Sequence, residues 1–115
     1  YAFALAAIRE GSRVRVPGLR PDSAQPDMAV HRALCALGAR DASDDAGAGI
    51  AFGRPLSGGE FDASLWPDGS LAVMAAAGMA SAPVTLRGLG TLAAKESDRI
   101  EAMRAWLVAA GATMP

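Results

Sequence analysis

Two cations four residues apart, at the expected start of a helix, are the first candidates for chemistry. The segment KESDR runs from Lys95 to Arg99, and in a helix the side chains of these two residues share one face. The free N–H groups and the dipole of a helix favour anions at its start and disfavour cations there by about 0.3–1 kcal/mol each. The segment is therefore either a solvated helix start with ion pairs such as Glu96 with Arg99, or a site that binds phosphate or carboxylate. The spacing alone leaves both interpretations open.

Asp68 is the second candidate. It lies in the segment LWPDGS (65–70), directly ahead of an alanine-rich stretch. Pro-Asp-Gly in that position is typical of a turn or a helix cap. From this segment alone, a capping role is the favoured interpretation of Asp68.

The single histidine and the single cysteine are weaker candidates for a functional role. His31 and Cys35 have no Cys/His cluster around them that could bind a metal ion. We expect His31 at a helix surface or cap, and Cys35 as a small apolar residue of the core. One cysteine excludes a disulfide within the chain and favours a reducing compartment.

Composition excludes further classes of protein. The chain has 115 residues, of which 51% are hydrophobic and 20% are charged, and its formal net charge is -1. This length suffices for one domain with a core, and a charge near zero gives no reason to expect nucleic acid or an anionic membrane surface as a partner. No uninterrupted run of about 18 apolar residues predicts a membrane span.

The pattern of apolar residues predicts helices and short strands, and it repeats along the chain. FALAAIREGSRVRVPGL (3–19) aligns with VMAAAGMASAPVTLRGL (73–89) at a constant offset of 70 residues. Two alternating runs that flank Ser57-Gly58-Gly59 predict a β-hairpin between the copies. This mixture predicts a layered α/β sandwich of sheet on helices. The expected helices are 2–10, 26–38, 69–81 and 96–110, and the expected strands are 13–19, 40–44, 49–54, 60–65 and 84–89.

The motifs together resemble one enzyme family. KESDRIEAM (95–103) and LVAAGA (107–112), preceded by PDGSLAVMAAAGMASAPVTLRGLGTL (67–92), are similar to the 3-phosphoshikimate 1-carboxyvinyltransferases, also called EPSP synthases. QPD (25–27) and ALGA (36–39) fall where the preceding structural unit of that family belongs. The resemblance therefore covers essentially the whole chain, with the Lys-Glu-Ser-Asp-Arg block as its most specific part.

The resemblance implies an α/β (α+β) fold of repeated βαβαββ units in a two-domain enzyme. Residues 1–66 would be a partial unit and residues 67–115 the start of the next unit of the same domain, truncated at both ends. The implied reaction moves the carboxyvinyl group of phosphoenolpyruvate to the 5-hydroxyl of shikimate 3-phosphate, without metal or organic cofactor. It belongs to the shikimate pathway of aromatic amino acid biosynthesis. The rest of the same polypeptide would complete a cytoplasmic, monomeric enzyme without nucleic acid or membrane partners, and the fragment alone is not expected to be active.

The resemblance also implies a role for each matching residue. Asp68 would contact the target hydroxyl and accept its proton. Lys95 would bind the shikimate side and stabilise developing negative charge, and Glu96 would transfer a proton at the methylene carbon. Arg99 would hold the carboxylate or phosphate of phosphoenolpyruvate, a bidentate task that suits a guanidinium group. Thr91 falls where the family binds shikimate 3-phosphate.

Two residues depart from the family pattern. Many members have Asn-Leu-Arg-Val before the Lys-Glu pair, whereas this chain has Thr91 and Ala93 in place of the Asn and the Arg. The hydroxyl of Thr91 can make only some of the hydrogen bonds that an Asn amide makes. A second interpretation therefore stays open, namely a divergent, non-catalytic paralog or a substrate-binding module of the same fold.

Overall fold

Helices and strands follow one another in the expected order. This computed structural model describes residues 1–94 and 98–114. Every expected element is present with bounds that differ by a few residues, and a short helix, α4, is additional. The helices are α1 (Ala2–Ile8), α2 (Pro26–Leu37), α3 (Pro67–Ala77), α4 (Gly90–Ala93) and α5 (Arg99–Ala109), and the strands are β1 (Arg13–Pro17), β2 (Arg40–Asp41), β3 (Gly47–Ala51), β4 (Gly59–Asp62) and β5 (Val84–Arg87).

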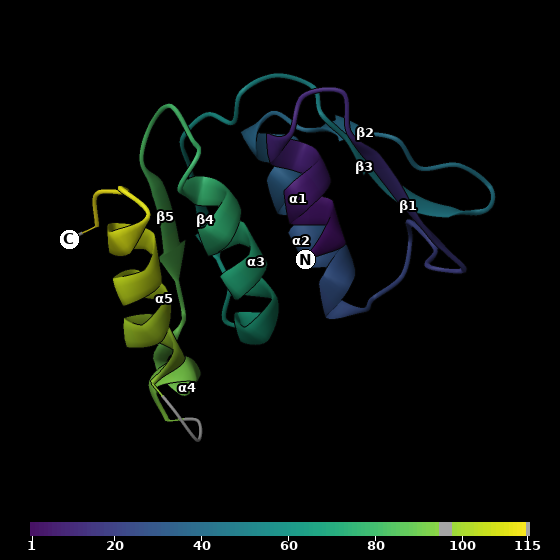
Figure 1. The fold of residues 1–115 in the computed structure, drawn as a ribbon. Coiled ribbons are helices and arrows are strands. Elements are labelled where there is room, and N and C mark those ends of the chain that lie inside the picture. The colour runs from purple at the N-terminus through teal and green to yellow at the C-terminus, as the bar shows by residue number, and fades with distance from the viewer. Residues whose placement is uncertain (95–97, 115) are drawn as a thin grey trace.

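These strands form two separate sheets (Figure 1). One sheet has the antiparallel order β1-β3-β2, in which Val14 and Asp41 both lie opposite Ile50. The other pairs β4 with β5 in parallel, with Phe61 opposite Leu86. Helices α1 and α2 contact β3, and α3 contacts β5, so helices cover both sheets. The mixed α/β class with sheet packed on helices is therefore confirmed.

The hairpin expected around Ser57-Gly58-Gly59 is wrong, because β3 and β4 belong to different sheets. The segment instead packs against its neighbours. Ser57 donates from its backbone N–H and its hydroxyl to the Leu37 carbonyl, at 2.7 and 2.9 Å. A Cβ on Gly58 would lie 2.6 Å from the Pro83 carbonyl oxygen, so its glycine serves a close approach of two backbones and not a turn.

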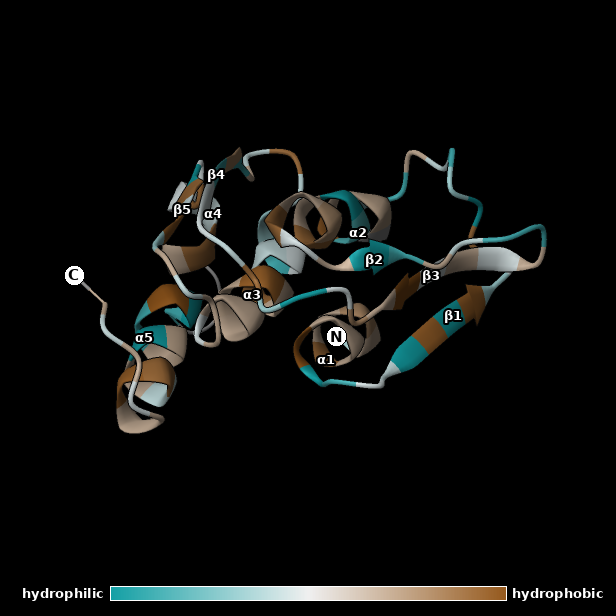
Figure 2. Ribbon diagram, turned by 90° about the horizontal axis from the view of Figure 1, so that it is seen from above, coloured by the Kyte–Doolittle hydropathy of each residue, from teal (hydrophilic) through white to brown (hydrophobic). Residues whose placement is uncertain are grey.

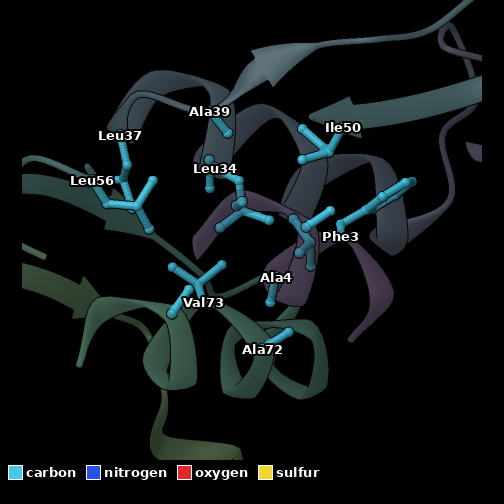
Figure 3. Close-up of a cluster of buried hydrophobic side chains, with 14 of the residues drawn as sticks. Phe3, Ala4, Leu34, Leu37, Ala39, Ile50, Leu56, Ala72 and Val73 are labelled. Atoms are coloured by element: carbon cyan, nitrogen blue, oxygen red, sulfur yellow. The ribbon is translucent and has the colours of Figure 1, made fainter. Parts of the chain in front are cut away.

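The main core joins α1, α2, α3 and β3. Figure 3 shows large side chains such as Leu34, Ile50 and Val73, each with 0% exposure, meeting small ones such as Ala4 and Ala72. The small residues let the helices approach closely, and the large ones fill the space between them. Helix α3 is apolar around most of its circumference (Figure 2), as expected for a helix that is covered on several sides.

A second, smaller cluster fixes α5 against α3. It consists of Leu71 and Met74 on α3, Leu92 on α4 and Leu107 on α5, all buried. The cluster therefore packs α4 and α5 against α3.

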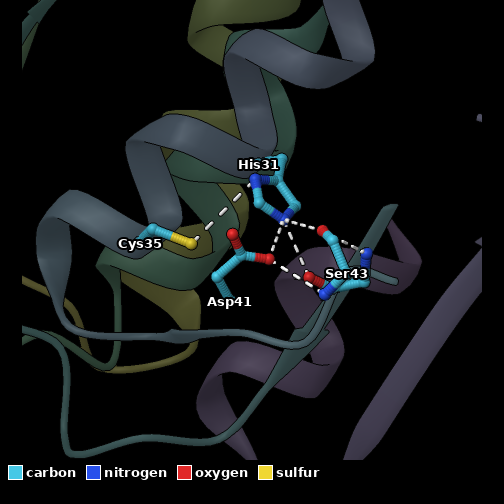
Figure 4. Close-up of polar contacts among 5 residues, drawn as sticks. His31, Cys35, Asp41 and Ser43 are labelled. Carbon is cyan, nitrogen blue, oxygen red and sulfur yellow. Dashed lines mark hydrogen bonds and ion pairs between the residues drawn. The ribbon is translucent and has the colours of Figure 1, made fainter. Parts of the chain in front are cut away.

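His31 was expected at a helix surface or cap, and this expectation is wrong, because its side chain is 5% exposed. Its Nε2 lies 2.7 Å from the Gly49 carbonyl oxygen, and a carbonyl only accepts, so Nε2 carries the proton. Ser43 Oγ and Asp41 Oδ1 lie 3.3 and 3.4 Å from the same nitrogen (Figure 4). His31 thus ties α2 to the β2–β3 hairpin.

Cys35 lies half-buried against the main core, one turn after His31 on α2. Its Sγ is 4.0 Å from His31 Nδ1 (Figure 4). Burial, with a smaller contribution from the negative charge of Asp41, raises the pKa of the thiol to about 11. The thiol therefore stays protonated at neutral pH and is unsuited to act as a nucleophile.

We expect His31→Leu to lower the free energy of unfolding of the chain by about 1–3 kcal/mol, because the Gly49 carbonyl then loses its donor in a buried place. Urea denaturation followed by circular dichroism measures this change. Arg32→Leu, on the exposed side of the same helix, is the matched control and should change stability by less than about 0.5 kcal/mol. Equal effects of the two substitutions would contradict the assigned role of His31.

Candidate functional site

Asp68 lies in the first turn of α3. The helix begins at Pro67 with Trp66 as its N-cap residue, so Asp68 does not occupy the capping position that its segment suggested. The loop before it is well ordered by its own hydrogen bonds. Trp66 Nε1 donates to the Asp62 carbonyl at 3.0 Å, and Asp62 Oδ1 accepts the Ser64 N–H at 2.9 Å, which lowers the pKa of Asp62. A carboxylate in the first turn is favoured by the helix dipole.

Arg99 is the first residue of α5. The Asp98 side chain caps this helix by accepting the Glu101 N–H at 3.1 Å. The cation at the helix start is thus offset by an anionic cap beside it.

The structure brings Asp68 and Arg99 together. Arg99 Nη1 donates to Asp68 Oδ1 at 2.7 Å, across 31 residues of sequence. The Arg99 side chain is 42% exposed and the Asp68 side chain is 55% exposed, so a ligand from solvent can reach both. Two of the predicted site residues therefore form one charged group at the adjoining starts of α3 and α5.

The remaining predicted site residues are placed only in part. Lys95 and Glu96 lie outside the described residues, so their proposed positions stay predictions. Thr91 is exposed on α4, where its neighbour Leu92 is fully buried and anchors the short helix in the cluster with Leu107. Ala93, the other departure from the family pattern, is also exposed on α4.

Gly88 is a positioning residue that the motifs did not single out. Its φ is 76°, and a Cβ there would lie 2.7 Å from Ser64 Cβ, in the loop that leads to Asp68. The end of β5 thus contacts the loop before α3 directly. The sequence did carry a signal, because both copies of the repeat end their strand in Gly-Leu, and Gly18 in the first copy also has a positive φ, of 81°.

Comparison with known protein families shows to which family the chain belongs. A family model described as EPSP synthase (3-phosphoshikimate 1-carboxyvinyltransferase) matches residues 1–114. The chain belongs to the EPSP synthase family. The resemblance inferred from the Lys-Glu-Ser-Asp-Arg block is therefore confirmed.

Curated proteins with the same printed name are similar over nearly the whole chain. The 3-phosphoshikimate 1-carboxyvinyltransferase of Methanosphaerula palustris is 37% identical over 114 residues, which are 99% of this chain and 27% of that protein. That of Bordetella petrii is 37% identical over 117 residues, which cover 97% of this chain and 26% of the relative. The enzyme of Methanoculleus marisnigri is 39% identical over 100 residues, which are 87% of this chain and 24% of that protein. The chain thus spans about a quarter of the length of these EPSP synthases.

A metal-binding cluster and a membrane-spanning helix are both absent from residues 1–94 and 98–114. Within those ranges, no group of three or more His, Cys, Asp or Glu side chains is arranged to hold a metal ion. No helix within the same ranges is long and apolar enough to cross a membrane. The Asp68–Arg99 group is the candidate site because two residues singled out by the sequence meet there.

We expect Asp98→Ala to destabilise the chain by about 1 kcal/mol, because the Glu101 N–H loses its capping acceptor. Thermal and urea denaturation measure the effect. Asp98→Asn, which keeps an oxygen acceptor, should stay within about 0.5 kcal/mol of the unsubstituted chain. If the alanine and asparagine variants lost the same stability, Asp98 would not act as the cap.

Proposed function

We propose that this chain is part of an enolpyruvyl transferase. This enzyme moves the carboxyvinyl group of phosphoenolpyruvate to the 5-hydroxyl of shikimate 3-phosphate, in the shikimate pathway. The observation that supports the proposal is the 2.7 Å contact between Arg99 and Asp68, which puts a guanidinium suited to binding an anion beside a carboxylate suited to accepting a proton, both exposed. Membership of the EPSP synthase family supports the choice of reaction.

Each residue has a specific task in this proposal. Asp68 accepts the proton of the 5-hydroxyl as its oxygen attacks C2 of phosphoenolpyruvate. Arg99 holds the carboxylate or phosphate of phosphoenolpyruvate by a bidentate contact. Lys95 stabilises negative charge on the shikimate side, Glu96 transfers a proton at the methylene carbon, and Thr91 contacts shikimate 3-phosphate. Loss of phosphate, together with a proton from the methyl group of the tetrahedral intermediate, then gives the enol ether, and the chemistry needs no metal or organic cofactor.

The proposal includes an arrangement within a larger protein. Residues 1–66 and 67–115 belong to two successive βαβαββ units of one domain, and the rest of the same polypeptide supplies the remaining substrate contacts. The similar order of α1, β1, α2 and of α3, β5, α5 supports this division. The complete enzyme acts in the cytoplasm as a monomer, without nucleic acid or membrane partners.

Phosphate release tests the proposal in the full-length polypeptide that carries this chain. Phosphate should appear from phosphoenolpyruvate only when shikimate 3-phosphate is also present. Omission of either substrate is the control. Binding of both substrates without phosphate release would support the alternative, a non-catalytic paralog, which the exposed Thr91 and Ala93 on α4 favour.

A further inference from the structure

Trp66 stands immediately before α3, two residues ahead of Asp68, and its side chain does not cap the helix. The indole Nε1 instead donates to the carbonyl of Asp62, the last residue of β4, at 3.0 Å. The backbone N–H of Trp66 donates to the Ala63 carbonyl, also at 3.0 Å. Hydrogen bonds from the side chain and the backbone of one residue therefore close the loop between β4 and α3.

The end of β4 to which Trp66 is tied has a fixed position. Asp62 lies opposite Arg87 of β5, and the N–H of the next residue, Ala63, donates to the Arg87 carbonyl at 2.9 Å. Ala63 is also completely buried. The indole thus connects the start of α3 to the paired strands β4 and β5.

The first turn of α3 contacts both the indole and α2. A Cβ on Gly69, the residue after Asp68, would lie 2.9 Å from Val30 Cγ2 on α2 and 3.6 Å from Trp66 Cε3. Glycine therefore lets this turn approach α2 closely, and the indole packs beside it. Without the indole the turn would be held on fewer sides, and any shift of the turn would carry Asp68 with it.

A carboxylate that accepts a proton depends on its position. A general base acts within about 2.6–3.2 Å of the group whose proton it takes. A misplacement of about 1 Å can lower a rate by about 10²-fold. We propose that Trp66 is a positioning residue, which holds Asp68 at the place where it meets the 5-hydroxyl of shikimate 3-phosphate. This inference rests on the proposed function, and it adds a residue outside the Lys-Glu-Ser-Asp-Arg block that acts through the backbone of α3.

Trp66→Phe tests this role in the full-length polypeptide that carries this chain, because it keeps an aromatic ring and removes the N–H donor. The turnover number of phosphate release should fall by about three- to tenfold, the range expected from one net hydrogen bond. The KM of each substrate should stay within about twofold, because Trp66 acts on the base and not on substrate binding. A rise in KM without a fall in turnover would overturn the proposal. Trp66→Met, whose flexible side chain fills gaps, is the second variant if the phenylalanine protein does not fold.

Trp106→Phe is the matched control. It makes the same chemical change on α5, two turns after Arg99, at a residue that is 58% exposed. Turnover should stay within about twofold of the unsubstituted enzyme. An equal loss of turnover in Trp106→Phe and Trp66→Phe would count against the proposal, because the removal of any indole would then have the same effect.

A double-substitution cycle with Asp68→Asn separates positioning from general support of the fold. Once residue 68 cannot accept the proton, its position no longer matters, so adding Trp66→Phe should lower the remaining turnover by less than about 1.5-fold. If Trp66→Phe lowers turnover equally in both backgrounds, or in neither, the positioning role is wrong and the proposed function stands. If Asp68→Asn itself leaves turnover unchanged, the role of Asp68 in the proposed function is wrong as well.

Discussion

Asp68→Asn is expected to lower the turnover of phosphoenolpyruvate and shikimate 3-phosphate by about 10²–10⁴-fold, the usual contribution of a general base. The amide keeps the shape of the side chain and its place in the first turn of α3, but it cannot take the hydroxyl proton. Steady-state phosphate release by the full-length polypeptide that carries this chain measures the loss.

Glu60→Gln is the control for this substitution. Glu60 forms a more exposed ion pair, with Arg87 at 2.5 Å, on the sheet of β4 and β5. Its loss should leave turnover within about twofold, because exposed pairs contribute little to stability. An Asp68→Asn enzyme that kept the unsubstituted rate would remove Asp68 from the reaction.

Leu34→Ala is expected to lower the free energy of unfolding of the chain by about 2–5 kcal/mol, because it opens a cavity in the main core. Leu34 has 0% exposure on α2 and belongs to the cluster that α1, α2, α3 and β3 share (Figure 3). Few neighbours can fill the space, since many of them are alanines whose side chains are too short to reach it. Urea denaturation measures the change.

Leu5→Ala removes the same atoms from an exposed place and is the control for Leu34→Ala. The Leu5 side chain on α1 is 61% exposed, so its truncation should change stability by less than about 0.5 kcal/mol. If Leu5→Ala cost as much as Leu34→Ala, residues 1–8 would have to be packed differently from the arrangement described for α1.

The helices were predictable because each carries its own local signal. Apolar residues at helical spacing marked α1, α2, α3 and α5 near their observed bounds. Pairing of strands has no such local signal. The two glycines after Ser57 looked like a turn, yet the partner of Gly59 is Val84 on a strand that follows α3. Likewise α4 has four residues, too few to show a helical period.

The candidate site was predictable in its residues and not in its contacts. The Lys-Glu-Ser-Asp-Arg block drew attention to Arg99, and the Pro-Asp-Gly segment drew attention to Asp68. Their direct contact depends on how α3 and α5 pack through Leu71 and Leu107. Packing between segments far apart in the sequence leaves no local signal from which it could be predicted. His31 illustrates the same limit, because its buried position depends on the hairpin of β2 and β3 that closes over α2.

Transfer of the carboxyvinyl group itself is the most direct test of the proposed function. The full-length polypeptide that carries this chain is incubated with ¹³C-labelled phosphoenolpyruvate and shikimate 3-phosphate, and the products are followed by ¹³C NMR. We predict an enol ether on the 5-oxygen that forms at the rate of phosphate release, and that the Asp68→Asn enzyme makes far more slowly. Labelled pyruvate in place of the ether, or no reaction of either substrate, would contradict an enolpyruvyl transferase.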